Sequence, residues 1–466
     1  MTNNNTICAV ATATGGAIGI IRVSGDEAIE ITSRIFKPAN SSKTLLDCKP
    51  YTLTFGNIIN GNNEVVDEVL VSVFHMPHSY TGENSVEISC HGSEYILRQV
   101  MKLLLENGCR TAEPGEFTKR AFLNGKMDLS QAEAVADLIA SSNKATHDMA
   151  LSQLRGHFSN ELSALRAQLL KLTSLLELEL DFSDHEELEF ANRSELHNLA
   201  AHIQERVRTL ALSFETGNAL KNGIPVAIVG NTNVGKSTLL NRLLHEDKAI
   251  VSDIHGTTRD YIEDTTELNG ITFRFVDTAG IRKTDDVVES IGIERTFQKM
   301  DEARIVLWLI DNQPTKADIE NIERHITNKK LIVVRNKVDK MEALASESSV
   351  FENMSLSVSD YKFISISAKQ GTNISELENL IVEAADIPQL SESDVVVTSA
   401  RHYNALLRAN DSLTHVIESL QLDLSGDLIA EDLHEVLDSL SDITGDGRIS
   451  SQETLNNIFK NFCIGK

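Results

Sequence analysis

Cysteine, basic residues and long apolar runs are all scarce in this sequence, and each scarcity excludes a class of protein. The five cysteines (Cys8, Cys48, Cys90, Cys109 and Cys463) are scattered and form no Cys-x-x-Cys pair. This pattern argues against a disulfide framework and predicts a reducing compartment, the cytoplasm. No apolar run approaches the about 18 residues of a membrane span. Residues 1–10 have the character of neither a signal peptide nor a transit peptide.

Positive charge is also in deficit. The chain has 43 Lys and Arg residues against 68 Asp and Glu residues, a formal net charge of −25. Because nonspecific binding to phosphates needs a basic field, the charge argues against a general nucleic-acid coat. Any contact with RNA is therefore expected to be local, or to be shared with a partner. The 41% hydrophobic and 24% charged composition is that of an ordinary globular chain, and 466 residues leave room for about three domains.

Three sequence textures follow one another along the chain. Residues 1 to about 120 alternate short β-type runs with turns and short helical stretches, which predicts an α+β domain. From Leu129 to about Phe214, leucines recur at helical spacing on one wide apolar stripe, which predicts long helices. From about 221 to 385, five buried strands alternate with helices, which predicts a doubly wound α/β sheet. The five predicted strands are 226–229, 273–276, 305–310, 331–334 and 363–366.

Helical texture returns after about 395, so an all-α domain on both sides of the α/β unit is predicted to carry that unit as an insertion. The alternative is four domains in a row. The predicted boundaries are 1–123 for the N-terminal domain, 124–220 for the first helical part, 221–385 for the inserted domain and 386–466 for the second helical part.

The inserted domain carries a phosphate-binding motif. Gly230-Asn-Thr-Asn-Val-Gly235-Lys236-Ser237 follows a predicted strand and opens a helix-compatible stretch that starts with Thr238. Glycines let the backbone wrap phosphates, and backbone N–H groups point inward at the start of the helix. Lys236 is expected to neutralise the β- and γ-phosphate oxygens. The Ser237 hydroxyl is expected to bind Mg²⁺.

Three further motifs follow other strand ends in the order that GTP binding requires. Asp277-Thr278-Ala279-Gly280 would place a carboxylate near the Mg²⁺ shell and a backbone N–H at the γ-phosphate. In Asn336-Lys337-Val-Asp339, the Asp339 carboxylate can accept two hydrogen bonds from the edge that guanine presents and adenine does not. Ser367-Ala368-Lys369 offers a backbone N–H to the guanine O6. The four motifs together predict a GTP site rather than an ATP site.

The catalytic equipment differs from that of many small GTPases. Ile281 stands where many of them have a glutamine that orients the attacking water. Candidates for orienting the water are Glu289 and the pair of consecutive charged residues Arg259 and Asp260. Thr258 is the predicted second Mg²⁺ ligand. Asn233 carries an acceptor oxygen in the phosphate loop, where a bound monovalent cation could replace an arginine finger.

Taken together, the motifs resemble the MnmE (TrmE) family of tRNA-modification GTPases, and the resemblance runs along the whole chain. In the GTPase part it rests on 230–237, 256–260, 277–282, Glu289 and 291–294. In the N-terminal part it rests on 18–25, 79–83, Glu87, 91–92, 114–117 and 120–126. The terminal Cys463-Ile-Gly-Lys466 is far more specific to the family than the GTPase motifs, which other potassium-dependent GTPases share.

The resemblance implies an N-terminal domain that binds 5-formyl-tetrahydrofolate and forms a homodimer, and a helical domain that carries a Ras-like GTPase. It implies K⁺-dependent GTP hydrolysis with Mg²⁺. With the FAD-dependent partner MnmG (GidA), in a heterotetramer, the family adds an aminomethyl or carboxymethylaminomethyl group at C5 of the wobble uridine of certain tRNAs. The competing reading is a regulatory GTPase in ribosome or RNA assembly, without one-carbon chemistry.

The resemblance also implies a role for individual residues. The folate ligands would be Arg22, Glu87, Lys126 and Lys466. The K⁺ ligands would be Asn233, Ser252, Ile254 and Thr257, with Ser237 and Thr258 on Mg²⁺. Catalytic roles would fall to Cys463, Glu289, Arg259 and Asp277. The remaining nucleotide-binding positions would be Val234, Gly235, Lys236, Thr238, Asp253, His255, Gly256, Thr278, Ala279, Gly280, Asn336, Lys337, Asp339, Ser367, Ala368 and Lys369.

Two other constellations contain metal-type residues and are weaker. His75 and His78 with Cys90 and His91 do not have the spacing of a zinc site. Residues 442–453 follow the spacing of an EF-hand loop, but no second such loop accompanies them, and the family has a tight helix–helix turn here.

Overall fold

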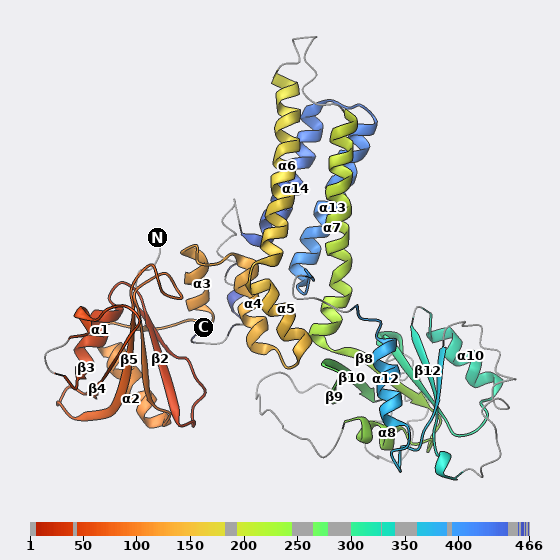
Figure 1. Cartoon of the computed structure of the whole chain (residues 1–466), viewed down its shortest axis with the longest axis horizontal. Coiled ribbons are helices and arrows are strands. Elements are labelled where there is room, and N and C mark those ends of the chain that lie inside the picture. The colour runs from red at the N-terminus through yellow and green to blue at the C-terminus, as the bar shows by residue number, and fades with distance from the viewer. Residues whose placement is uncertain are drawn as a thin grey trace, which may run out of the picture. The chain divides into compact units, whose positions relative to one another are not determined.

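The computed structural model groups the chain into two compact units (Figure 1). One unit contains residues 1–140, 150–208 and 404–466, and the other contains 141–149 and 209–403. The residues that the structure describes are 6–40, 44–181, 193–244, 264–277, 300–327, 329–340, 361–388, 394–445, 455, 458–460, 462 and 465.

The N-terminal part of the first unit is a seven-stranded sheet in the order β3-β4-β5-β6-β2-β1-β7. Its strands pair antiparallel, except that β1 and β7 are parallel. Valine and isoleucine at alternate positions bury one face of the sheet against α1 and α2. The elements are β1 Ile7–Val10, β2 Ile18–Ser24, α1 Ala28–Ile35, β3 Phe36–Pro38, a 3₁₀ helix Leu45–Asp47, β4 Thr52–Ile59, β5 Val65–Phe74, β6 Ser85–His91, α2 Glu94–Glu106, β7 Arg110–Thr111 and α3 Glu116–Leu123.

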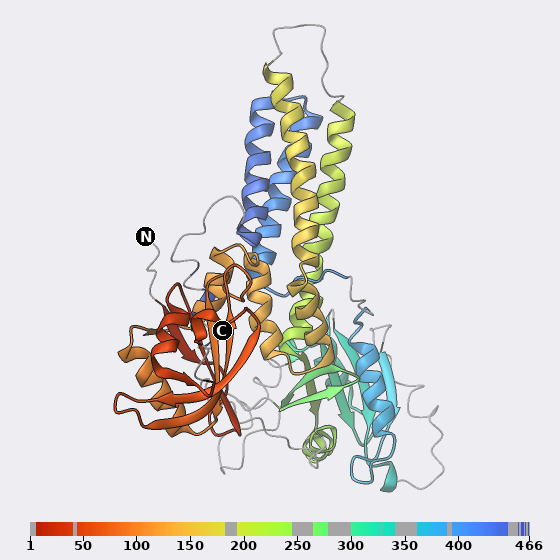
Figure 2. The same cartoon turned by 60° about the vertical axis from the view of Figure 1, so that its left-hand side comes forward.

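The remainder of the first unit is helical. The helices α6, α7, α13 and α14 run side by side in both Figure 1 and Figure 2. The predicted apolar stripe is confirmed on α6, where six of its members are at most 3% exposed: Phe158, Leu162, Leu165, Leu169, Leu172 and Leu176. The helices are α4 Leu129–Ala140, α5 Lys144–Leu154, α6 His157–Asp181, α7 Arg193–Asn222, α13 Ala400–Gln421 and α14 Gly426–Thr444.

Helices from both sides of the α/β segment pack together. The Gln204 side chain of α7 donates to Thr414 of α13 at 2.8 Å, and Ser412 of α13 donates to Glu435 of α14 at 3.1 Å. The first of these contacts joins residues 210 apart in sequence, one before and one after the α/β segment, which fits the predicted insertion. The domain boundaries given above stay predictions.

The second unit contains a six-stranded sheet in the order β13-β12-β11-β8-β10-β9. All pairings are parallel except that of β9 with β10. The central strand β11 is buried along its whole length, as expected for a sheet covered on both faces. The elements are β8 Ile224–Gly230, α8 Lys236–Leu243, β9 Asp264–Leu268, β10 Ile271–Asp277, β11 Ile305–Ile310, α10 Lys316–His325, β12 Lys330–Arg335, a 3₁₀ helix η2 Val338–Lys340, β13 Tyr361–Ser365 and α12 Ile374–Ala384.

The predicted fold class is thereby confirmed: an α+β N-terminal part, an all-α part and a doubly wound α/β sheet. In the α/β sheet, β8 lies between β10 on one side and β11 on the other, so the strand order reverses beside β8. The carboxyl ends of β8 and β11 therefore border a crevice of the kind in which such sheets bind ligands.

Candidate nucleotide site and N-terminal polar cluster

The phosphate-binding loop connects the end of β8 to the start of α8. Gly230 has φ +148°, and a Cβ there would lie 2.3 Å from the carbonyl oxygen of Leu309. Gly235 has φ +101°, and a Cβ there would lie 2.3 Å from the Asn336 side-chain nitrogen. Both positions therefore require glycine for conformation and for space. The predicted strand–loop–helix context of the motif is present.

Lys236 is the first residue of α8, and its ammonium group lies over the loop. Its Nζ donates to the carbonyl oxygens of Gly230 at 2.7 Å and of Asn231 at 2.9 Å. The N-terminal end of α8 adds the partial positive charge of the helix dipole to this ammonium group. The loop is therefore suited to binding an anion with several phosphates.

The predicted guanine-reading residues lie together at the ends of β12 and β13. The buried Ser367 donates its hydroxyl to Asp339 Oδ1 at 2.7 Å. That hydrogen bond is the main cause that lowers the pKa of Asp339, and it further favours the charged carboxylate. A charged, acceptor-only carboxylate is the group that can pair with two donors on one base edge.

Asn336 and Lys337 tie this guanine loop to the phosphate loop. Asn336 Nδ2 donates to the Val234 carbonyl at 2.8 Å, and Asn336 Oδ1 accepts from the backbone of Ala368 at 3.0 Å. Lys337 Nζ donates to the Asn233 carbonyl at 2.6 Å. The buried Asn336 therefore holds three motifs, widely separated in sequence, in one arrangement.

Sequence reasoning missed two residues beside this site. The Arg242 guanidinium on α8 donates to the Lys369 carbonyl at 3.1 Å, and Asp311 accepts from Lys337 Nζ at 2.8 Å. Neither belongs to a recognisable motif. The only available signal was that Asp311 directly follows the strand β11, at the same sheet edge as the motifs.

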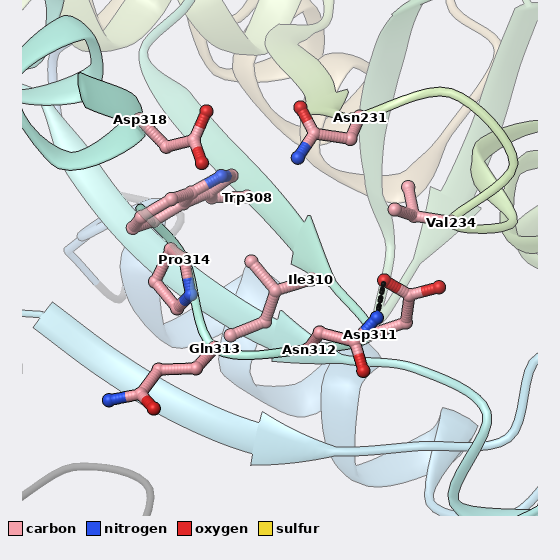
Figure 3. Close-up of a pocket in the computed structure, with 9 residues that line it drawn as sticks. All are labelled: Asn231, Val234, Trp308, Ile310, Asp311, Asn312, Gln313, Pro314 and Asp318. Atoms are coloured by element: carbon pink, nitrogen blue, oxygen red, sulfur yellow. Dashed lines mark hydrogen bonds between the residues drawn. The ribbon is translucent and has the colours of Figure 1, made fainter. Parts of the chain in front are cut away.

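A small pocket of about 90 Å³ lies next to the phosphate loop (Figure 3). Polar side chains provide most of its lining, which includes two carboxylates and three side-chain amides. Its lining residues are Asn231, Val234, Trp308, Ile310, Asp311, Asn312, Gln313, Pro314 and Asp318.

In the N-terminal sheet the predicted folate residues Arg22 and Glu87 are joined. Arg22 Nη2 and Nε donate to Glu87 Oε1 at 2.7 and 3.0 Å. The guanidinium lies 5.5 Å from the ring centroid of Tyr80 and 5.7 Å from that of Phe117. Its Nη1 donates to the Gly465 carbonyl at 3.4 Å, so residue 465 of the C-terminal tail reaches this pair. Lys126 lies instead against Pro77, to whose carbonyl it donates at 3.0 Å.

A buried ionic network lies close to Phe117. Arg120 binds Glu83 at 2.9 Å and Glu116 at 3.0 Å, and Glu116 also accepts from Arg110. Burial by itself raises the pKa of Glu116, but hydrogen bonds from Arg110, the Glu113 backbone and Arg120 outweigh burial and lower it overall. Arg120 and Glu116 are only 9% and 8% exposed, so this network is part of the fold.

Several predicted site residues lie outside the described residues, and Asp277 ends β10 with its side chain outside them. Most of the EF-hand-like stretch also lies outside, although Asp442 and Thr444 fall within α14. In the part of the chain that the structure describes, no helix is long and apolar enough to cross a membrane. The predicted residues outside are Ser252, Asp253, Ile254, His255, Gly256, Thr257, Thr258, Arg259, Asp260, Thr278, Ala279, Gly280, Ile281, Glu289, Cys463 and Lys466.

The fold and the site define a P-loop GTPase. Two family models match: the MnmE helical domain over residues 129–463 and the GTP-binding protein TrmE N-terminus over residues 6–126. The chain belongs to the MnmE family of tRNA modification GTPases. This membership confirms the predicted family and the predicted GTP-hydrolase class.

Curated relatives named tRNA modification GTPase MnmE match along the full length of the chain. The proteins of Phocaeicola vulgatus and Bacteroides thetaiotaomicron are each 57% identical over 100% of both chains. That of Bacteroides fragilis is 58% identical over 100% of both chains. A solved structure of Aquifex aeolicus Era bound to GDP.AlF4- is 30% identical over 40% of this chain and 66% of its own, with a TM-score of 0.27.

Proposed function

We propose that this chain is a K⁺-dependent GTPase that works as a homodimer in the cytoplasm. With the FAD-dependent partner MnmG (GidA), it adds an aminomethyl or carboxymethylaminomethyl group at C5 of the wobble uridine of certain tRNAs. The observation that carries the GTPase part is the joining of the guanine loop to the phosphate loop through Asn336, described above. Family membership supports the tRNA part.

Two of the proposed ligands of the Mg²⁺ and K⁺ ions, Ser237 and Asn233, are among the described residues and carry suitable oxygen atoms. The Ser237 hydroxyl, at the second residue of α8, is an oxygen ligand of the kind that Mg²⁺ takes, and Thr258 would be the second. For K⁺, the Asn233 carbonyl accepts a hydrogen bond from Lys337, and the side-chain amide oxygen of Asn233 would be the ligand. Ser252, Ile254 and Thr257 would complete that site. A cation there supplies positive charge close to the β- and γ-phosphates, while Glu289 or Arg259 is proposed to orient water.

The first prediction is that hydrolysis depends on which alkali cation is present. Ile281 cannot orient water or contribute charge, so the transition state needs charge from a bound cation. Replacing K⁺ by Na⁺ at equal ionic strength should slow steady-state GTP turnover by at least about tenfold, or about 1.4 kcal/mol of barrier. Equal rates in the two salts would exclude the cation mechanism. GDP affinity, measured in both salts, serves as the control.

The folate proposal draws support from the open face of the N-terminal sheet. Arg22, Glu87, Ser72 and Leu53 stand in register across four strands and share one face. Near β1 this face is covered by Phe117 of α3, which packs with Ile7 and Ala9. The Arg22–Glu87 pair therefore lies between the part of the face that Phe117 covers and the part that is open. The Glu87 carboxylate can bind the amino edge of a pterin, and the Arg22 guanidinium can bind an anionic oxygen.

The second prediction concerns this pair. Glu87→Gln should weaken binding of 5-formyl-tetrahydrofolate by about tenfold or more, because a charge-assisted hydrogen bond to the pterin is lost. Equilibrium dialysis measures the affinity. Glu94→Gln is the matched control, since Glu94 is an exposed acid on α2 that pairs only loosely with Arg98. Undiminished folate binding by the Glu87 variant, or no binding by the wild type, would contradict the proposed site.

The homodimer proposal draws support from apolar residues on the same open face. Leu53, Phe55 and Leu70 are 66%, 51% and 44% exposed, and Phe55 lies directly opposite Leu70 in the strand register. Exposed apolar patches of this kind mark interaction surfaces, and a twofold dimer would cover the same patch on both copies. A second copy on this face would also cover the region beside Arg22 and Glu87.

The third prediction concerns Cys463, proposed as the nucleophile or acid–base group at the bound one-carbon unit. A thiol can share its proton near neutral pH and a serine hydroxyl cannot. Cys463→Ser should therefore leave wobble uridine largely unmodified while GTP hydrolysis continues at the wild-type rate. Mass spectrometry of tRNA nucleosides from cells that carry only the variant tests this. Full modification would remove Cys463 from the catalytic residues, and an absence of modification even with the wild type would contradict the proposed tRNA-modifying role.

A further inference from the structure

We propose that Asp311 is a positioning residue for GTP hydrolysis, which fixes the phosphate loop at Asn233 by holding the Lys337 ammonium group in place. This inference rests on the proposed function, in which the Asn233 side chain serves the reaction. Asp311 belongs to none of the GTPase motifs. Among the described residues, its hydrogen bond to the motifs is the one that it accepts from the Lys337 ammonium group.

The sheet order explains why Asp311 can act between two motifs. The strand β11 lies between β12 and β8, and its last paired residues are Leu309 beside Gly230 and Ile310 beside Arg335. The phosphate loop begins at the end of β8, and Asn336 and Lys337 directly follow β12. Asp311 follows β11, so it reaches the sheet edge midway between the two nucleotide-binding loops.

The Lys337 ammonium group connects all three strand ends. Its Nζ donates to Asp311 Oδ2 at 2.8 Å and to the Asn233 carbonyl at 2.6 Å. The Lys337 and Asp311 side chains are 32% and 29% exposed, so solvent screens this ion pair only in part. Asp311 Oδ1 is also bound, since Asn312 Nδ2 donates to it at 3.3 Å (Figure 3). Both carboxylate oxygens are therefore occupied, which fixes the orientation of the carboxylate.

The conformation of Asn233 makes this anchoring necessary. Asn233 has φ +63° and Lys337 has φ +69°, both in the left-handed region that residues other than glycine seldom adopt. Such a conformation persists only where surrounding contacts hold it. The hydrogen bond from Lys337 holds the Asn233 carbonyl, and the carbonyl direction determines on which side of the loop the side chain can lie. Asp311 prevents the ammonium group from turning away toward the phosphates of a bound nucleotide.

The test is a double-mutant cycle on the full chain with Asp311→Asn, Asn233→Ala and both changes together. Turnover at saturating GTP and the affinity for a fluorescent GDP analogue are measured for each protein. Asp311→Asn alone should lower kcat by about tenfold while GDP affinity changes less than about threefold. In the Asn233→Ala background the same change should cost less than about twofold, because the group that it positions is absent.

Two controls separate positioning from a general effect of charge or folding. Asp318→Asn removes a carboxylate from the same pocket and should leave kcat unchanged. Asp311→Glu keeps the carboxylate and should restore at least half of the lost rate. An equal loss from Asp311→Asn in both backgrounds, or an unchanged kcat, would overturn the proposal. A wild type that hydrolyses GTP equally in K⁺ and Na⁺ refutes the proposed cation mechanism only, because the cycle still reports whether Asp311 acts through Asn233.

Discussion

Asp339→Asn should convert a protein that prefers guanine nucleotides into one that prefers xanthine nucleotides. The charged carboxylate of Asp339, which accepts a hydrogen bond from Ser367, can also accept from the N1–H and the 2-amino group of guanine. An amide offers one acceptor and one donor, so its NH₂ would face the 2-amino group of guanine but would pair with the C2 carbonyl of xanthine. Leaving polar groups of the base and the side chain unpaired should lower GTP affinity by roughly 100-fold.

Competition binding with GTP, XTP and ATP measures this change directly. The variant should lose GTP affinity, gain XTP affinity and remain unable to bind ATP. Because Asn336 and Lys337 still anchor the phosphate loop, the fold of the site should be unaffected, and circular dichroism provides that control. A variant that still binds GTP in preference to XTP would show that Asp339 does not read the base.

Glu116→Gln should destabilise the N-terminal sheet by about 3 kcal/mol. The change removes the carboxylate that Arg110 and Arg120 share, and breaking a buried pair from one side leaves an uncompensated charge. The chain has several domains, so a single unfolding transition would not isolate the effect. Hydrogen exchange of the amides of β1 and β2 isolates the effect, and the protection of these amides should fall roughly 100-fold.

The same residue predicts a dependence on pH. The pKa of Glu116 is lowered in the folded protein, so its contribution to stability is fully present above its unfolded pKa of about 4.3. That contribution is lost as pH falls through the folded pKa. Wild-type protection should therefore decline in acid below about pH 4, and the Glu116→Gln variant should lack this component of the decline. Glu113→Gln, which removes a neighbouring acid outside the ion pairs, is the control, and an identical acid profile in all three proteins would contradict this role.

The sequence alone determined the features that depend on local pattern. Helical spacing of leucines predicted the buried stripe of α6, and continuous apolar runs predicted the strands of the doubly wound sheet, because periodicity follows directly from backbone geometry. A GTP site was predicted from Gly230 and Gly235 and from the motifs that end in Asp339 and Lys369. At strand ends, the glycines let the backbone wrap phosphates, and the other two motifs offer hydrogen bonds to guanine. The family resemblance supplied the predicted roles of Arg22 and Glu87, which no local pattern would have given.

Tertiary structure alone decided how the motifs are held. No spacing in the sequence connects Lys337 to Asp311, 26 residues before it, or to Asn233, 104 residues before it. Their meeting depends on β11 lying between β12 and β8, an order that pairing across the sheet sets. The ionic network from Glu83 to Arg120 likewise arises from packing, since each member by itself reads as a surface charge. Local patterns report which backbone conformation a segment prefers, whereas contacts between segments depend on which buried surfaces match, and that is a property of the whole chain.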